Sequence, residues 1–267
     1  MKNVIAAAAL SLVLSDFTYA NEQRDEAMMK ITPSTLVDAD IHAVSPALAR
    51  FGREAITEDL WTREALSPRD RSIVTVAMLI ARNQPGELKH YIAVALDSGV
   101  TPAEVSEIIT HLAFYSGWPN AMSAVSVTKA IFAARGITAE ALPAASPTLL
   151  PLNEQVEKQR AETVEKNVGP ISPGLVKFTA DPLFLDLWQR PALTPRDRSL
   201  VTVSALIAAG QSAQIGYHLN RAMDNGLSAE EAGEVVAQAA FYAGWPNAFT
   251  AAPVVGEVLR ARESKAE

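Results

Sequence analysis

Side chains that can do chemistry are few and widely spaced in this 267-residue sequence. It contains no cysteine, which excludes disulfides, thiolate metal ligands and thiol-based redox reactions. The spacing of the four histidines does not predict a metal cluster, so we expect neither a metal nor another cofactor. These histidines are His42, His90, His111 and His218. The remaining chemistry is proton transfer by His, Glu or Tyr and anion binding by Arg.

The composition is that of a globular chain. Hydrophobic residues make up 49% and charged residues 20% of the sequence. The 30 acidic residues exceed the 23 basic ones, and the basic residues are scattered. Because a phosphate backbone requires clustered positive charge, nucleic acid is not an expected partner.

An internal repeat organises the chain. Residues 59–121 and 186–248 match without a gap at 31 of 63 positions, always at an offset of 127. The longest shared motif runs from Phe114 to Asn120 and recurs from Phe241 to Asn247. We therefore predict two tandem copies of one folding unit.

Each copy is predicted to be helical. A hydroxyl N-cap, a proline and an acid occur at Ser67, Pro68 and Asp70, and the same types recur from Thr194, which marks a helix start. The apolar run that follows resembles a buried strand, but the caps and the alanine content favour a buried helix.

A second helix in each copy follows a glycine that suits positive φ, Gly99 or Gly226. Capping boxes begin at Thr101 and Ser228. The Gly-Trp-Pro-Asn segment should end this helix, and a last helix is predicted at about 121–134 and 248–261.

The first twenty residues have the features of an export signal. Lys2 precedes an apolar run at residues 4–14, and Thr18 and Ala20 are small residues where a signal peptidase cleaves. The run is too short for a stable membrane anchor. We expect cleavage after Ala20 and a periplasmic or secreted protein; the alternative is an ordinary buried helix.

These observations define the expected domains. Residues 1–20 are the signal peptide, 21–135 the first repeat, 136–152 a proline-containing linker and 153–267 the second repeat.

Several motifs resemble those of the gamma-carboxymuconolactone decarboxylase family, over roughly residues 45–135 and 172–262. The resemblance implies an all-α chain of two alkylhydroperoxidase D-like helical units. In the first copy it is carried by Leu60-Trp61-Thr62-Arg63, the run from Arg71 to Ile80, Glu87-Leu88-Lys89, Gly99-Val100-Thr101 and Tyr115-Ser116-Gly117-Trp118-Pro119.

One branch of that family consists of peroxidases with a Cys-x-x-Cys pair, which this chain lacks. The other branch decarboxylates an unsaturated lactone acid, so the resemblance implies a lyase acting on a small carboxylate. Such a reaction requires carboxylate orientation, hydrogen-bond donors for a dienolate and a proton donor. A thiol-independent peroxide-handling protein is a disfavoured alternative, because no residue is equipped for it.

Arg71 and Arg198 occupy positions where the family motif carries arginine, and a guanidinium group suits a carboxylate. They are candidate substrate-binding residues, with a salt bridge to a nearby acid as the alternative. For Arg63 and Arg190 the salt bridge is the preferred interpretation.

The candidate acid and base depart from the family segment Glu-Leu-Lys-x-His. The first copy has Glu87 but places His90 one position early, with Tyr91 in the histidine position. The second copy has His218 in register but Gln214 instead of glutamate. Since successive helix positions point about 100° apart, His90 should leave the original face.

Three hypotheses remain open. A composite or partly degenerate site uses Glu87 with Tyr91, or His218; one copy alone is active; or the chain binds a small molecule without turnover. Trp118 and Trp245 either line a substrate pocket or pack in the core beside the turn. His111 aligns with Gln238 and is assigned a structural role.

By analogy with single-domain relatives of this fold, we expect a homo-oligomer, with a trimer of fused chains favoured. Export would separate the protein from aromatic-acid breakdown inside the cell. We then expect either another carboxylated lactone or keto acid as the substrate, or no substrate at all.

Overall fold

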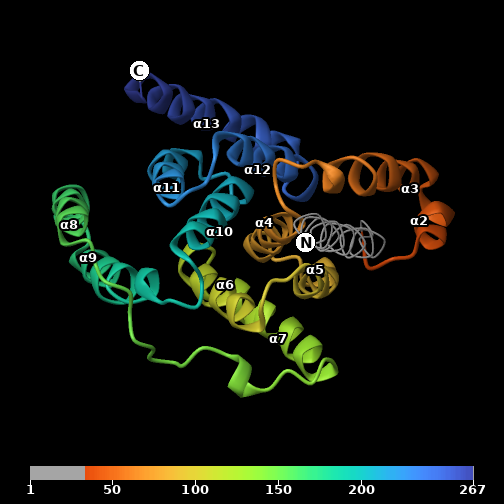
Figure 1. Cartoon of the computed structure of the whole chain (residues 1–267), viewed down its shortest axis with the longest axis horizontal. Coiled ribbons are helices and arrows are strands. Elements are labelled where there is room, and N and C mark those ends of the chain that lie inside the picture. Colours follow the sequence, from red (N-terminus) through yellow and green to blue (C-terminus); the bar gives the residue numbers. More distant parts are fainter. Residues whose placement is uncertain (1–33, 267) are drawn as a thin grey trace, which may run out of the picture. The chain divides into compact units, whose positions relative to one another are not determined.

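The computed structural model describes residues 34–266 and divides the chain into two compact units, residues 1–64 and 65–267 (Figure 1). The predicted export signal lies outside the described residues. Every regular element within 34–266 is helical, which confirms the predicted all-α class. None of the described helices combines the length and apolar character needed to cross a bilayer.

The described part of the first unit is a chain of short helical segments. It contains α2 (Asp38–Val44), α3 (Pro46–Phe51), a π-helical turn (Gly52–Thr57) and a 3-10 turn (Leu60–Thr62).

The second unit holds the main helices of both repeats. From the first repeat these are α4 (Pro68–Ala81), α5 (Pro85–Asp97), α6 (Pro102–Tyr115) and α7 (Trp118–Ala134). After a linker with one 3-10 turn (Ala139–Ala141) come α8 (Glu154–Val168), α9 (Pro173–Phe178), a π-helical turn (Thr179–Phe184), a 3-10 turn (Leu187–Gln189), α10 (Pro195–Ala208), α11 (Ser212–Asp224), α12 (Ala229–Tyr242) and α13 (Trp245–Ala266). From α3 to α7, each element begins 127 residues before its counterpart, which confirms the tandem duplication.

The predicted helix starts are confirmed by their caps. The Ser67 and Thr194 hydroxyls each accept a hydrogen bond from the third residue of the helix, at 3.1 Å. Complete capping boxes open α6 at Thr101 and α12 at Ser228. Gly99 precedes the first box with a φ of 93°, a left-handed conformation that favours glycine.

The last helix of each repeat starts earlier than predicted. The helices α7 and α13 begin at Trp118 and Trp245 rather than near positions 121 and 248. Gly117 and Gly244, with φ of 90° and 94°, complete the turn before the tryptophan. The proline that follows fits the first helical turn, where no intrahelical N–H bond is lost.

The two repeats of the second unit share one core. The apolar helices α4 and α10 pack against each other at its centre, where Figure 1 shows them side by side. Their central residues, 73–80 and 200–207, are buried on every face, as the sequence predicted. The helix α6 packs on α10 and α12 packs on α4, so each repeat supplies a helix to the other.

Charged residues reinforce this exchange at the start of α4 and α10. Arg69 binds Asp70 of its own repeat at 3.0 Å and Asp197 of the other at 2.8 Å. Arg196 makes the reciprocal bonds, to Asp197 at 2.9 Å and Asp70 at 2.8 Å. The repeats are therefore interlocked within residues 65–267 and are not two separately packed bodies.

Candidate functional site

A fully buried ion pair lies where α6 of the first repeat crosses α10 of the second. The Arg198 guanidinium donates to one Glu107 oxygen at 2.9 Å, and both side chains are 0% exposed. The other Glu107 oxygen accepts from Arg190 Nε at 2.8 Å. A buried charge without a partner is costly. Both arginines are therefore held in place by their bonds to the Glu107 carboxylate.

His111 lies beside this pair as a neutral base. Its Nε2 is 2.7 Å from the Thr202 hydroxyl, which itself donates to the Arg198 carbonyl at 2.9 Å. The hydroxyl proton is thus in use, so Nε2 of His111 donates and its Nδ1 carries no proton. Complete burial, followed by the Arg198 charge, lowers the pKa of His111 well below its ordinary value.

Aromatic rings connect the ion pair to His218. His111 stacks on Tyr115 with ring centroids 4.7 Å apart. The Trp188 ring is nearly parallel to those of Phe184 and His218, at 5.8 Å and 5.9 Å. The Trp188 indole N–H donates to the Tyr115 hydroxyl at 2.9 Å, which fixes the tyrosine from the other repeat.

A pocket of about 560 Å³ opens beside these rings, in the size range of small-molecule sites. The helices α8 and α11 and the π-helical turn form its walls. Its polar lining includes Tyr115, Arg160, Gln214 and His218, and Phe184 contributes an apolar surface. It is therefore a largely apolar hollow lined by a few polar groups.

His218 and Tyr115 have fixed protonation states in this pocket. Burial, followed by the charge of Arg221, lowers the pKa of His218 to about 4, so its imidazole is neutral at pH 7. Its Nδ1 is buried without a hydrogen-bond partner in the described chain. Burial raises the pKa of the Tyr115 hydroxyl, which stays protonated. Since this hydroxyl accepts from Trp188, its own proton is available as a donor to a ligand.

Arg160 supplies the cationic edge of the pocket. Glu157 binds its Nε at 2.8 Å and one terminal nitrogen at 2.5 Å. The guanidinium carbon lies 4.2 Å from the centre of the Phe184 ring. The other terminal nitrogen, Nη1, is buried and has no hydrogen-bond partner among residues 34–266. A carboxylate ligand would satisfy this donor.

Arg221 adds a second guanidinium group near the rings. It stacks over Trp188 at 4.1 Å from the ring centre and makes no ion pair within residues 34–266. The region around His218 therefore carries a positive charge that favours an anionic ligand.

The counterpart of this cluster, on α4, α5 and α12, has different side-chain pairings. Arg71 donates to Glu234 at 2.6 Å and to Gln238 at 3.1 Å, which reproduces the Arg198 pair with glutamine in place of His111. Tyr91 stands where the second repeat has His218, and its hydroxyl is 2.7 Å from that of Tyr242. The two tyrosines therefore contact each other where the other site keeps a free histidine nitrogen.

The predicted site residues fall in different surroundings. His218 lines the pocket, whereas Arg198 is buried behind the aromatic rings and Arg71 lies in the counterpart cluster. On α5, Tyr91 is buried and Glu87 and His90 are half-buried. Burial raises the pKa of Tyr91 well above its ordinary value, and the Glu87 charge adds to this shift.

The two tryptophans are on the surface. Trp118 is 59% exposed and Trp245 is 51% exposed, so the interpretation that they pack in the core is wrong. Each starts a helix directly after a glycine turn. Neither lines the pocket beside His218.

Sequence reasoning did not select Glu107, Arg160 or Arg221 for this site. Glu107 aligns with Glu234 at the offset of 127, but a glutamate shared by the two repeats is only a weak signal of a functional site. Arg160 lies on a polar helix that resembles an ordinary solvent-exposed segment, and Arg221 aligns with Val94, so the duplication does not mark it.

The comparisons with known proteins agree with this architecture. The family model described as "Carboxymuconolactone decarboxylase family" matches residues 46–130 and again residues 173–257. The chain belongs to the carboxymuconolactone decarboxylase family. The two matches coincide with the two repeats, which confirms both the resemblance and the duplication.

Two curated relatives are similar to part of this family member. A 4-carboxymuconolactone decarboxylase of Acinetobacter baylyi is 33% identical over 82 residues, which cover 31% of this chain and 61% of the relative. A nitrosuccinic acid decarboxylase of Metarhizium robertsii is 34% identical over 84 residues, covering 30% and 59%. The chain thus spans about three fifths of the length of these relatives, whose names support a decarboxylase-like family.

A solved structure shows the same fold for the wider chain. It is a candidate gamma-carboxymuconolactone decarboxylase subunit from Burkholderia xenovorans LB400, with a TM-score of 0.50 and 19% identity. The similarity covers 90% of this family member and 98% of the solved chain.

Proposed function

We propose that this protein is a carboxy-lyase that decarboxylates a small carboxylated lactone or a related unsaturated acid in the pocket beside His218. One observation carries the proposal. A neutral histidine nitrogen, a tyrosine proton and an arginine N–H, all without partners in the described chain, line the same largely apolar pocket.

Arg160 is proposed to bind a carboxylate of the substrate. Its free Nη1 is held in place by the bidentate bonds to Glu157 and by contact with Phe184. A buried, fixed guanidinium loses little entropy when it binds an anion. The family resemblance favours Arg198 for this role, but the bond of Arg198 to Glu107 supports a positioning role instead.

The proposed reaction breaks the carbon–carbon bond to a carboxylate. Carbon dioxide leaves, and the electron pair remains on the organic fragment as a dienolate. The Tyr115 hydroxyl donates a hydrogen bond to the developing oxyanion. A proton then adds to carbon from His218, which regains it from water.

His218 can donate this proton only if substrate binding raises its pKa. In the empty pocket, burial and Arg221 keep the imidazole neutral. A bound carboxylate favours the imidazolium, because an opposite charge nearby raises a histidine pKa. We therefore expect proton uptake when an anionic substrate binds.

We propose one active site for each chain, built from both repeats. The first repeat contributes Tyr115 on α6, and the second contributes His218 and Arg160. The Tyr91–Tyr242 contact supports the proposal that the counterpart is not catalytic, and we therefore propose no catalytic role for Glu87 or His90.

Binding without turnover is the second candidate function. Gln214 lines the pocket where the first repeat has Glu87, and an amide cannot transfer a proton as a carboxylate does. A protein of this kind would retain affinity for the acid and release no carbon dioxide.

The deciding experiment measures carbon dioxide release from 4-carboxymuconolactone and from a panel of carboxylated lactones and keto acids. We expect turnover by the wild type and a loss of about 100-fold or more in His218→Ala. Tyr91→Phe at the equivalent position is the matched control and should stay within about threefold of the wild type. Binding with no release from any substrate would reject the lyase and support the binding protein.

We also propose that the chain is exported, with cleavage after Ala20, and that the mature protein forms a trimer. Exposed apolar residues at equivalent positions of both repeats support self-association: Trp118, Met122, Trp245 and Phe249. Mass spectrometry of the protein from its native host tests the cleavage. Light scattering tests the assembly, and a monomer mass would reject it.

A further inference from the structure

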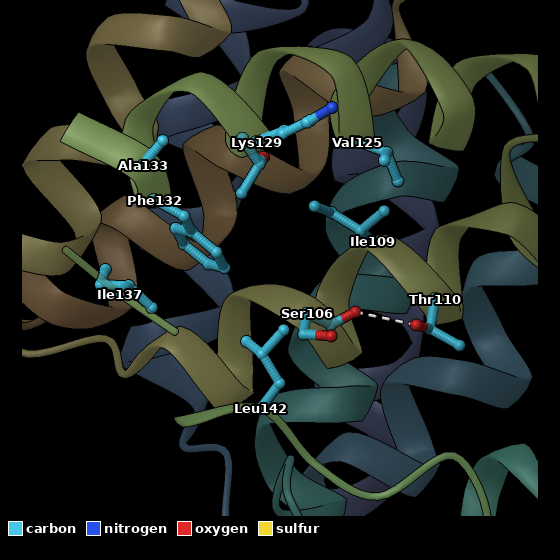
Figure 2. A pocket seen from close by; sticks show the side chains of 10 residues that line it. Ser106, Ile109, Thr110, Val125, Lys129, Phe132, Ala133, Ile137 and Leu142 are labelled. Atoms are coloured by element: carbon cyan, nitrogen blue, oxygen red, sulfur yellow. Dashed lines mark hydrogen bonds between the residues drawn. The ribbon is translucent and has the colours of Figure 1, made fainter. Parts of the chain in front are cut away.

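A second pocket lies in the first repeat, between α6, α7 and the start of the linker (Figure 2). Its volume is about 430 Å³, and it shares no lining residue with the pocket beside His218. Figure 2 shows Ile109, Phe132, Ile137 and Leu142 around the hollow, so its body is apolar.

Polar residues of both α6 and α7 also line this hollow. Lys129 lies at the rim, and its ammonium group makes no ion pair within residues 34–266. Thr128 also lines the pocket, is 4% exposed and has a buried hydroxyl without a hydrogen-bond partner in the described chain. Thr110 donates its own proton to the Ser106 carbonyl at 2.9 Å, the dashed line in Figure 2.

The second repeat lacks these polar groups. At the positions 127 residues further on, every polar residue of this lining is replaced by a small or aliphatic one, although the helices themselves are retained. Ser106, Thr110, Thr128 and Lys129 become Gly233, Ala237, Val255 and Gly256. The fold therefore does not require a lysine or hydroxyl groups at this place.

The linker wall of the pocket is held in position. Shortly after Leu142, the carbonyl groups of Ala144 and Ala145 accept hydrogen bonds from Arg190, at 3.0 Å and 2.8 Å. Arg190 is itself fixed by the buried carboxylate of Glu107. A pocket with a preformed wall needs little ordering when a ligand binds.

We propose that this pocket binds a small amphipathic monocarboxylate, since its volume lies in the range of small-molecule sites. The apolar body lies against Ile109, Phe132 and Leu142, and the carboxylate pairs with the Lys129 ammonium. One cation beside a hollow with an apolar body matches a ligand with one negative charge and an apolar chain. This site is independent of the proposed decarboxylation.

Octanoate is the test ligand, and 1-octanol is the uncharged control ligand of the same chain length. Binding to the full chain is measured by NMR of the isoleucine methyl groups. We expect octanoate to shift the signals of Ile109 and Ile137 and to leave Ile215, on α11, unchanged. Octanol should bind at the same place about tenfold more weakly, the loss of one charge-assisted hydrogen bond.

Variants test separately whether the Lys129 charge and the free volume of the pocket are needed for binding. Lys129→Met should weaken octanoate binding about tenfold and leave octanol binding unchanged. Lys166→Met, at an exposed lysine outside the pocket, should change neither. Ala133→Trp should fill the hollow and abolish both, and His218→Ala should have no effect. Equal affinities for the two ligands, insensitivity to Lys129→Met, or shifts at Ile215 would each overturn the proposal.

Discussion

The indole N–H of Trp188 donates to the hydroxyl of Tyr115 at 2.9 Å, and the two residues come from different repeats. The bond determines the direction in which the tyrosine proton points, because the hydroxyl oxygen already accepts from one side. The repeat that carries His218 therefore depends on the other repeat for its hydrogen-bond donor. A chain in which each repeat folded separately would lack this arrangement.

Replacing Tyr115 should affect both turnover and stability. In Tyr115→Phe the oxyanion donor is lost, and we expect a decrease of about 100-fold in kcat on the substrate found by carbon dioxide release. The buried Trp188 N–H also loses its acceptor, at a cost of about 1–3 kcal/mol in the free energy of unfolding. Steady-state kinetics and urea denaturation measure the two effects. Tyr242→Phe is the control, and an equal loss of kcat there would contradict a site confined to the His218 pocket.

Folding stability should decrease as the pH falls from about 6.5 to about 4. Burial lowers the pKa of His218 in the folded state, so the unfolded chain binds the proton at a higher pH. Proton binding therefore stabilises the unfolded chain relative to the folded one over this interval. The contribution is fully present above pH 6.5 and amounts to at most about 3 kcal/mol. His111 acts in the same direction.

Urea denaturation at several pH values in this range tests the effect. In His218→Gln the slope of stability against pH should become shallower than in the wild type. An unchanged slope in His218→Gln would show that the imidazole is not buried as described.

Glu107→Gln should destabilise the protein by about 3–5 kcal/mol, because it leaves Arg198 and Arg190 without a buried counter-charge. The exposed pair of Lys177 and Asp181 serves as a comparison, since Asp181→Asn should cost less than about 1 kcal/mol. The free energy of unfolding in urea is the measurement. Similar costs for the two variants would mean that Glu107 is accessible to water.

Gly99→Ala should destabilise the protein by about 1 kcal/mol or more, because its φ of 93° strains any residue with a Cβ. No atom lies within 4 Å of the Cβ that would be added, so the cost comes from the backbone alone. Gly86, inside α5, also has free space around it, and Gly86→Ala should stabilise by about 0.5–1 kcal/mol. Thermal denaturation measures the change in Tm of each variant. A change in the same direction for both variants would contradict the left-handed conformation of Gly99.

The helices and their duplication followed from local sequence features. Caps such as Ser67 and Thr101 act on amides three residues away, so neighbouring residues alone determine the helix start. The family could be identified for the same reason, since its motifs recur at a constant offset. The tryptophan turn was misplaced because Pro119 is equally compatible with a turn and with the first turn of a helix.

The sequence by itself determined the helix starts that carry hydroxyl caps, the tandem repeat and the absence of thiol chemistry. Only the tertiary structure decided which residues meet, because contacts such as Arg198–Glu107 and Tyr115–Trp188 join residues 91 and 73 positions apart. The exchange of α6 and α12 buries helices that are apolar on every face, and this burial depends on the whole core rather than on neighbouring residues. That packing left His218 in an open pocket and brought Tyr91 against Tyr242, a difference that the repeat pattern does not contain.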